Sequence, residues 1–159
     1  MELLGVRLEL PANAPVVLLR EQAGEQRVLP IYIGPEEAKA IALALEGVVP
    51  PRPLTHDLFV NTLAVLGAEV ASVVVTEVRD RTYFAEIHLK TAGGELVISA
   101  RPSDAIALAV RCEAPIYASD ELIDEVGQEP PVEPEEDAAE IIDEFKDFIE
   151  NVSPEDFGA

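Results

Sequence analysis

Apolar and polar residues alternate along two parts of the chain in the same order. A run with a two-residue period spans Leu3–Leu10, and another spans Val70–Val78. Each is followed by two further β-like runs, which flank Ala23–Gly24 in the first part and Ala92–Gly94 in the second. Such alternation is typical of half-buried strands, and small residues between the runs are typical of turns. The pattern predicts three strands in each part.

A helix is predicted after each set of strands. The segments Leu29–Leu45 and Leu96–Val110 both contain a proline, an acidic residue in the turn that follows and the sequence AIALA. Proline and acidic residues favour the first turn of a helix. We interpret the two parts as copies of a β-β-β-α unit of roughly 45–50 residues. The expected fold class is therefore α+β.

An extra helix is expected between the copies. Apolar residues recur at helical spacing from Leu58 to Leu66, and Gly67 supplies the stop signal. Thr55 is expected to be the N-cap of this helix, and Ser103 that of the helix in the second copy.

The chain after Gly127 differs in composition. Residues 128–137 are rich in Pro and Glu, which predicts a linker between a domain at 1–127 and a last segment at 138–159. The last segment predicts an acidic amphipathic helix with one apolar stripe, formed by Ala138, Ile141, Ile142, Phe145, Ile149 and Val152. We expect it to dock on the chain's own body or on a neighbouring subunit, while a separate protein partner is the alternative.

The formal net charge of −20 is unevenly distributed. Residues 128–159 contain 12 acidic residues and one basic residue, a net charge of −11. Residues 1–127 contain 19 acidic and 10 basic residues, a net charge of −9. Because this field repels phosphates, we expect any binding of nucleic acid to be weak and salt-dependent.

The composition also bounds the class of protein. Hydrophobic residues make up 48% of the chain, which is typical of a folded protein. No apolar run is long enough for a membrane helix, so no membrane partner is expected. The single cysteine, Cys112, rules out an intrachain disulfide. We therefore expect a cytoplasmic protein.

Two short Arg-Pro segments, each followed by a helix start, contain the candidate functional residues. The first is RPLTHD, with Arg52, His56 and Asp57, and the second is RPSD, with Arg101 and Asp104. Carboxylates are favourable in a first helical turn, so capping alone explains the aspartates. A helix start requires neither the arginines nor the histidine.

If the two segments converge, these residues form one polar cluster. Its arginines could hold a phosphate, and the imidazole of His56 could act as acid or base. Asp57 and Asp104, with Glu37 as a further ligand, could hold Mg²⁺ or Mn²⁺. The alternative is an Arg–Asp network that only pins the two copies together.

Several segments resemble the bifunctional nuclease family. They are LPIYIGPEEAKAIALALEG, RPLTHDL, TYFAEIHL and ISARPSDAIALAVR, and the resemblance extends from Met1 to about Val126. The most specific of them are RPLTHDL and ARPSDAIALA. The resemblance implies an α/β domain with a mixed sheet, a homo-oligomeric assembly and nuclease activity on both DNA and RNA.

Two functions therefore remain open. The first is a metal-assisted nuclease in which Arg52, His56, Asp57, Arg101 and Asp104 do the chemistry. The second is a non-catalytic oligomeric module, in which the same cluster holds a small anionic ligand and the C-terminal helix recruits a protein partner.

Overall fold

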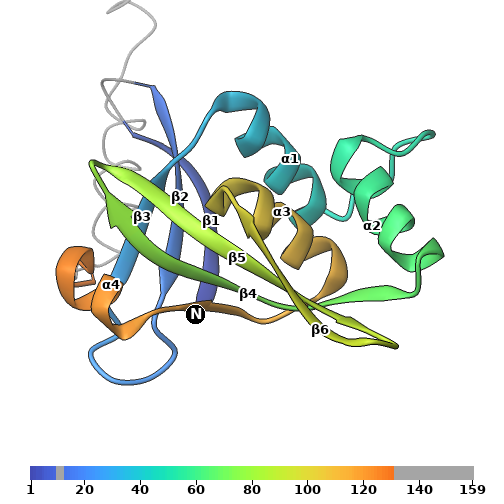
Figure 1. Ribbon diagram of the computed structural model, residues 1–159. Coiled ribbons are helices and arrows are strands. Elements are labelled where there is room, and N and C mark those ends of the chain that lie inside the picture. Colours follow the sequence, from blue (N-terminus) through green and yellow to red (C-terminus); the bar gives the residue numbers. More distant parts are fainter. Residues whose placement is uncertain (10–12, 131–159) are drawn as a thin grey trace, which may run out of the picture.

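The computed structural model describes residues 1–9 and 13–130 (Figure 1). The predicted C-terminal helix and most of the predicted linker lie outside these residues. The elements follow in the order β1 (Glu2–Glu9), β2 (Ala14–Arg20), β3 (Val28–Tyr32), α1 (Pro35–Leu45), α2 (Thr55–Val65), β4 (Ala68–Arg79), β5 (Thr82–Thr91), β6 (Gly94–Ala100), α3 (Pro102–Cys112), β7 (Ile116–Ala118) and α4 (Asp120–Val126).

The strands form two sheets. β1, β2 and β3 make an antiparallel sheet in that order, and the second sheet has the order β6-β5-β4-β7. β4, β5 and β6 are antiparallel, whereas β7 pairs with β4 in parallel, so the second sheet is mixed. The predicted α+β class and its mixed sheet are confirmed.

The element order repeats β-β-β-α, as the sequence pattern predicts, with α2 as the extra helix between the copies. The turns fall where small residues were noted: Gly24 and Gly94 have positive φ angles of 74° and 118°. Gly67, with φ of 72°, follows the end of α2. β7 and α4 were not predicted, because a three-residue strand and a seven-residue helix are too short to show a period.

Two of the predicted helix caps are wrong by one or two residues. The N-cap of α2 is Leu54, so Thr55 is the first helical residue. The N-cap of α3 is Arg101, and Ser103 lies inside the helix, where it is buried. In α2 the carboxylate of Asp57 performs the capping role, since it accepts a hydrogen bond from the Leu54 N–H at 2.9 Å. Pro102 occupies the first turn of α3, where a missing N–H costs nothing.

One hydrophobic core joins the two copies. α1 and α3 lie side by side, and Ile41 of α1 packs in the same buried cluster as Ile106 of α3 (Figure 1). The apolar faces of both sheets contribute to this cluster, for example Leu19 and Val73, which are fully buried. Because α1 and α3 touch, the first turns of the two helices come close together, and that arrangement positions the candidate site.

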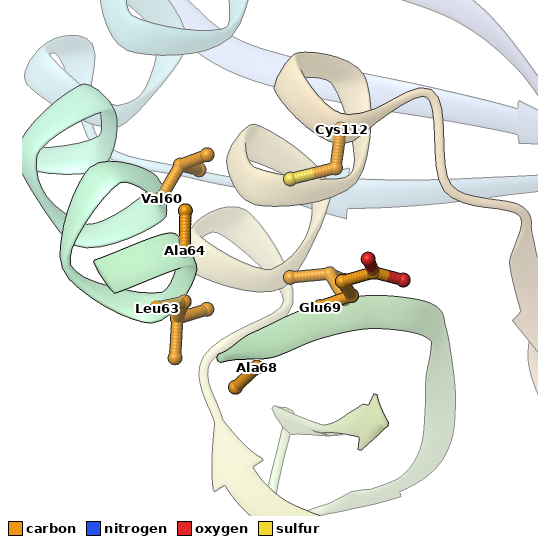
Figure 2. A pocket seen from close by; sticks show the side chains of 7 residues that line it. Val60, Leu63, Ala64, Ala68, Glu69 and Cys112 are labelled. Carbon is orange, nitrogen blue, oxygen red and sulfur yellow. The ribbon is translucent and has the colours of Figure 1, made fainter. Parts of the chain in front are cut away.

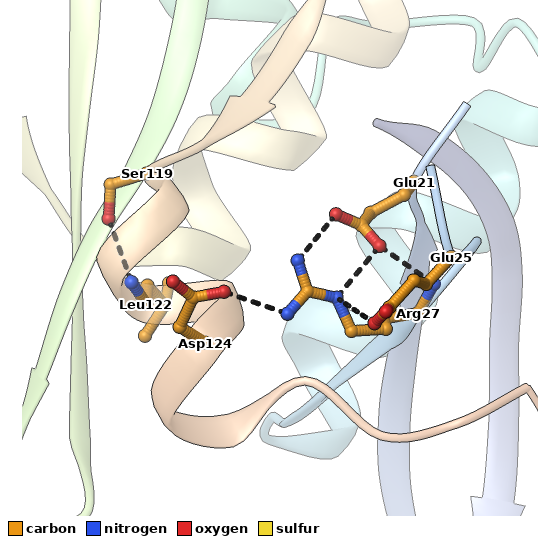
Figure 3. A network of polar contacts seen from close by, with 6 residues as sticks. All are labelled: Glu21, Glu25, Arg27, Ser119, Leu122 and Asp124. Atoms are coloured by element: carbon orange, nitrogen blue, oxygen red, sulfur yellow. Dashed lines mark hydrogen bonds and ion pairs between the residues drawn. The ribbon is translucent and has the colours of Figure 1, made fainter. Parts of the chain in front are cut away.

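An arginine network fixes α4 to the first sheet (Figure 3). The guanidinium of Arg27 makes two hydrogen bonds of 3.0 Å to the Glu21 carboxylate and one of 2.8 Å to Asp124 of α4. Nearby, the hydroxyl of Ser119 caps α4 by accepting the Leu122 N–H at 3.2 Å. We call Arg27, Glu21, Glu25 and Asp124 the Arg27 network.

Large apolar side chains are exposed on α2 and β6. No residue of α2 is buried, and Val65 is 86% exposed. β6 is an edge strand that exposes Leu96, Val97 and Ile98. Exposed apolar side chains on a free edge are typical of interaction surfaces. The homo-oligomer expected from the sequence stays a prediction.

Within the part of the chain that the structure describes, no helix combines the length and apolar character needed to cross a membrane.

Candidate functional site

Four charged or titratable side chains from three helix starts form one network. The guanidinium of Arg101 donates from Nε to Asp104 Oδ2 at 2.7 Å and from Nη2 to Asp104 Oδ1 at 3.2 Å. Its Nη1 donates to Glu37 Oε1 of α1 at 2.8 Å. His56 of α2 lies on the other side of Asp104, with Nε2 at 3.1 Å from Oδ1. We call Glu37, His56, Arg101 and Asp104 the Arg101 network.

The local sequence explains how these side chains meet. Glu37 and Asp104 occupy the first turns of α1 and α3, which the internal duplication places at equivalent positions. Arg101 directly precedes α3 and can therefore reach both carboxylates. Gly34, the N-cap of α1, leaves room for the Glu37 carboxylate, which would collide with a Cβ at that position. Two copies of one motif thus provide an acid from each half.

The charges in the network determine which ring nitrogen of His56 carries a proton. Burial raises the pKa of Asp104, but hydrogen bonds from Arg101 and then His56 outweigh that effect and hold it below its ordinary value. An ionised carboxylate only accepts hydrogen bonds, so Nε2 of His56 must carry the proton that it shares with Asp104. In the neutral form of the ring, Nδ1 is then the nitrogen without a proton. The Asp104 carboxylate therefore fixes the orientation of the His56 ring.

The Arg101 network lines an open groove between α1 and the start of α2. The groove has a volume of about 660 Å³. Its walls also include apolar side chains, among them Leu43, Leu54 and Leu58, and the cation Lys39. Leu58 is 56% exposed and the side chain of Arg101 is 65% exposed. The groove therefore combines an accessible guanidinium with an apolar wall.

Asp57 does not join this network, although it is adjacent to His56. Its Oδ1 accepts a hydrogen bond of 2.6 Å from Nε of Arg111, near the end of α3. The hydrogen bond from Arg111 holds the pKa of Asp57 below its ordinary value. Arg111 also donates to the carbonyl of Ala107 at 2.9 Å and is only 10% exposed. This pair lines a separate groove and ties α2 to α3.

Arg111 was not singled out from the sequence. A signal was present, because Arg111 is a charged residue that follows six consecutive apolar residues of α3, from Ala105 to Val110. The sequence next to Arg111 did not indicate which carboxylate it would pair with. Arg52, which was singled out, is exposed, and no hydrogen bond or ion pair joins it to another described residue. His88 faces away from its buried neighbours Ile87 and Leu89 on β5, as the alternation predicts.

The expected metal ligands do not converge. Glu37 and Asp104 share the Arg101 guanidinium, which lies between them, and Asp57 faces Arg111 instead. Across residues 1–9 and 13–130, no group of three or more His, Cys, Asp and Glu side chains is close enough to hold a metal ion. The arrangement therefore does not fit a ready-made divalent site. The Mg²⁺ or Mn²⁺ expected from the sequence stays a prediction.

Another hollow lies between α2, the start of β4 and the end of α3 (Figure 2). Its walls are mainly apolar, with Val60 and Leu63 on α2, and the Cys112 sulfur faces it. Burial raises the pKa of the Cys112 thiol. A thiol that is harder to ionise is a poor nucleophile, so the half-buried Cys112 is not a candidate nucleophile.

Comparison with known sequences relates the chain to one family. The family profile of the bifunctional nuclease domain matches residues 17–131. An uncharacterized protein of Mycobacterium tuberculosis is 41% identical over 164 residues, which cover 100% of this chain and 98% of that protein.

Plant proteins are more distant relatives. Bifunctional nuclease 2 of Arabidopsis thaliana is 32% identical over 115 residues, which cover 69% of this chain and 35% of the plant protein. Bifunctional nuclease 2 of Oryza sativa subsp. japonica is 31% identical over 108 residues, which cover 66% of this chain and 33% of the rice protein. The match thus spans about a third of the length of these plant proteins. The family match includes all four members of the Arg101 network, and this chain belongs to the bifunctional nuclease domain family.

Proposed function

We propose that this chain is a nuclease that hydrolyses phosphodiester bonds of DNA and RNA in the groove lined by the Arg101 network. One observation carries the proposal: a carboxylate-oriented histidine and an exposed arginine lie within one open groove. Membership of the family supports the reaction class, since relatives of this chain are named bifunctional nucleases.

Arg101 binds the phosphate in this proposal. Three of its five N–H bonds are directed at Asp104 and Glu37, so two remain for phosphate oxygens. A guanidinium that is already held by two carboxylates is positioned before the substrate arrives. It can then stabilise the negative charge that develops on the phosphoryl oxygens as the reaction proceeds.

His56 moves the proton. Nδ1 accepts a proton from a water molecule as the water oxygen forms its bond to phosphorus. The bond between phosphorus and the leaving sugar oxygen breaks, that oxygen takes its proton from solvent, and the imidazolium releases its proton to solvent. Asp104 holds the ring in place and stabilises its charged form in between, which makes it a positioning residue.

The test is cleavage of a labelled single-stranded oligonucleotide, as DNA and as RNA, by the purified chain. The proposal predicts cleavage by the wild type and a loss of about 10²- to 10⁴-fold for His56→Gln. His88→Gln is the matched control, because it changes the other histidine, and it should retain activity. Equal rates for all three preparations would indicate a contaminating nuclease and overturn the proposal.

Parallel reactions with Mg²⁺, Mn²⁺ and EDTA test the predicted cofactor. Activity that disappears in EDTA and returns with one of the ions supports a metal-assisted reaction. The competing function is a non-catalytic module, in which the ion pairs of Arg101 with Asp104 and Glu37 hold the two copies together and its remaining N–H groups bind a small anion. Saturable binding of the oligonucleotide without any cleavage would support that function instead.

A further inference from the structure

Recognition of nucleic acid needs cations along the strand, and the placement of the chain's cations limits how much of a strand can bind. The domain has ten basic residues against 19 acidic ones. Five of the ten form ion pairs with carboxylates of the described part of the chain, namely Arg20, Arg27, Arg79, Arg101 and Arg111. Only the other five basic residues of the domain are left to bind the phosphates of a longer strand.

The groove itself has two cations. Arg101 and Lys39 both line it, and Lys39 is exposed on α1. The same walls contain the acids Glu36, Glu37 and Asp104, which would repel a phosphate placed beside them. One or two phosphates is therefore the most that the groove can neutralise.

Apolar side chains occupy the rest of the groove. Leu54 and Leu58, which are 44% and 56% exposed, line the same groove from the start of α2. Every nucleobase has an apolar face, and covering these leucines with a base removes apolar surface from water without reading sequence. The groove thus offers one base position beside one or two phosphate positions.

We propose that this site binds single-stranded oligonucleotides through one base and at most two phosphates, so that a dinucleotide is already a complete substrate. This inference rests on the proposed nuclease function. A longer strand gains no contact outside the groove, because it meets a surface with a net negative charge. The enzyme is therefore indifferent to chain length and to base sequence.

The experiment compares the dinucleotide TpT with a 20-residue oligothymidylate. Binding is measured in EDTA, and cleavage per scissile bond is measured with Mg²⁺ or Mn²⁺. We expect affinities and rates per bond that agree within about threefold. On single strands each neutralised phosphate contributes about −0.7 to the slope of log K against log salt, so a fourfold rise in salt should weaken binding only about three- to sevenfold.

Matched variants locate the contacts. Lys39→Gln should make the salt slope shallower by about 0.7, whereas Arg7→Gln, an exposed cation on β1, should leave it unchanged. Leu58→Asn should weaken binding of TpT about fivefold, through lost apolar contact. Val65→Asn, which changes another exposed residue of α2 outside the groove, is its control.

The outcomes separate this inference from the proposed function. Cleavage that favours the 20-residue strand more than tenfold per bond, with a salt slope steeper than about −3, would overturn the inference and leave the nuclease intact. Absence of cleavage with length-independent binding of TpT would overturn the nuclease and support the short site. If neither TpT nor the 20-residue strand binds or is cleaved, both the inference and the proposed nuclease function fail.

Discussion

Two arginines in this protein each join two carboxylates from distant parts of the chain, yet their surroundings differ. Arg27 joins Glu21 to Asp124, and its side chain is 24% exposed. Arg101 joins Asp104 to Glu37, and its side chain is 65% exposed. The Arg101 network also includes a histidine and lines an open groove, whereas the Arg27 network contains no histidine and lines none of the hollows described above.

The comparison shows why an ion-paired arginine alone does not indicate a site. Both networks pin one half of the fold to another element, so the structural interpretation applies to each. Only the Arg101 network adds a titratable ring with an oriented proton and room for a ligand. Substitutions in the Arg27 network are therefore expected to affect stability alone, and substitutions in the Arg101 network to affect the reaction.

The largest expected effect comes from Asp104→Asn. The amide can donate to Nε2 of His56, which reverses the tautomer and places the proton on Nδ1, the nitrogen needed as a base. We predict a fall in kcat/KM of about 10²- to 10⁴-fold, measured on a single-stranded oligonucleotide. Asp124→Asn makes the same change in the Arg27 network and should leave kcat/KM unaltered. A similar loss of kcat/KM in both variants would show that the two networks do not differ in function.

The two arginines can be exchanged for methionine in the same way. Arg101→Met removes the phosphate-binding guanidinium and should lower kcat/KM by about 100-fold. Arg27→Met should retain activity and instead lower the melting temperature, because α4 loses its tie to the first sheet. Thermal unfolding and kinetics on both variants check the pair. If Arg101→Met lowered only the melting temperature, its network would be structural as well.

Arg111→Met sharpens the comparison with a third ion pair. The variant leaves the Asp57 carboxylate, which is 25% exposed, without its guanidinium, while the methionine keeps much of the packing. We predict a loss of about 2 kcal/mol in the free energy of unfolding, measured with urea. Activity at temperatures below the unfolding transition should stay within about twofold of the wild type. A loss of activity in the folded variant would place Asp57 in the catalytic machinery after all.

Acid pH provides the smallest effect. The folded-state pKa of Asp57 is lower than its ordinary value of 3.8, so its stabilising contribution is complete above that value and is lost as the pH falls through the lowered pKa. The difference in unfolding free energy between wild type and Asp57→Asn should be constant from about pH 5 to 8 and shrink below about pH 4. A difference that grew on acidification would contradict the ion pair.

Much of the fold could be predicted from the sequence because the two copies repeat one pattern. Each copy alternates in period two and then carries a proline, an acid and AIALA, and these signals are local. The cap residues could not be placed to within one position, since Thr55 and Asp57 both suit the start of α2. The sequence favoured the hydroxyl, whereas the structure uses the carboxylate.

The candidate site was predicted in part. His56, Arg101, Asp104 and Glu37 meet because α1 and α3 pack together, which the duplication suggests but does not determine. The different directions of His56 and Asp57 follow from helix geometry, because consecutive residues point about 100° apart. Arg111 and Lys39 were missed, since their roles depend on which helix faces which and no short motif marks them.

The measurement that tests the central claim most directly is ¹⁵N NMR of the two histidine rings during a titration with TpT in EDTA. The chain contains only two histidines, so His88→Gln assigns both signals. The account predicts a His56 ring protonated at Nε2, whose signals shift as TpT binds, while those of His88 stay fixed and Arg101→Met abolishes the shift. A His56 ring that does not respond to TpT, or a response that survives Arg101→Met unchanged, would contradict it.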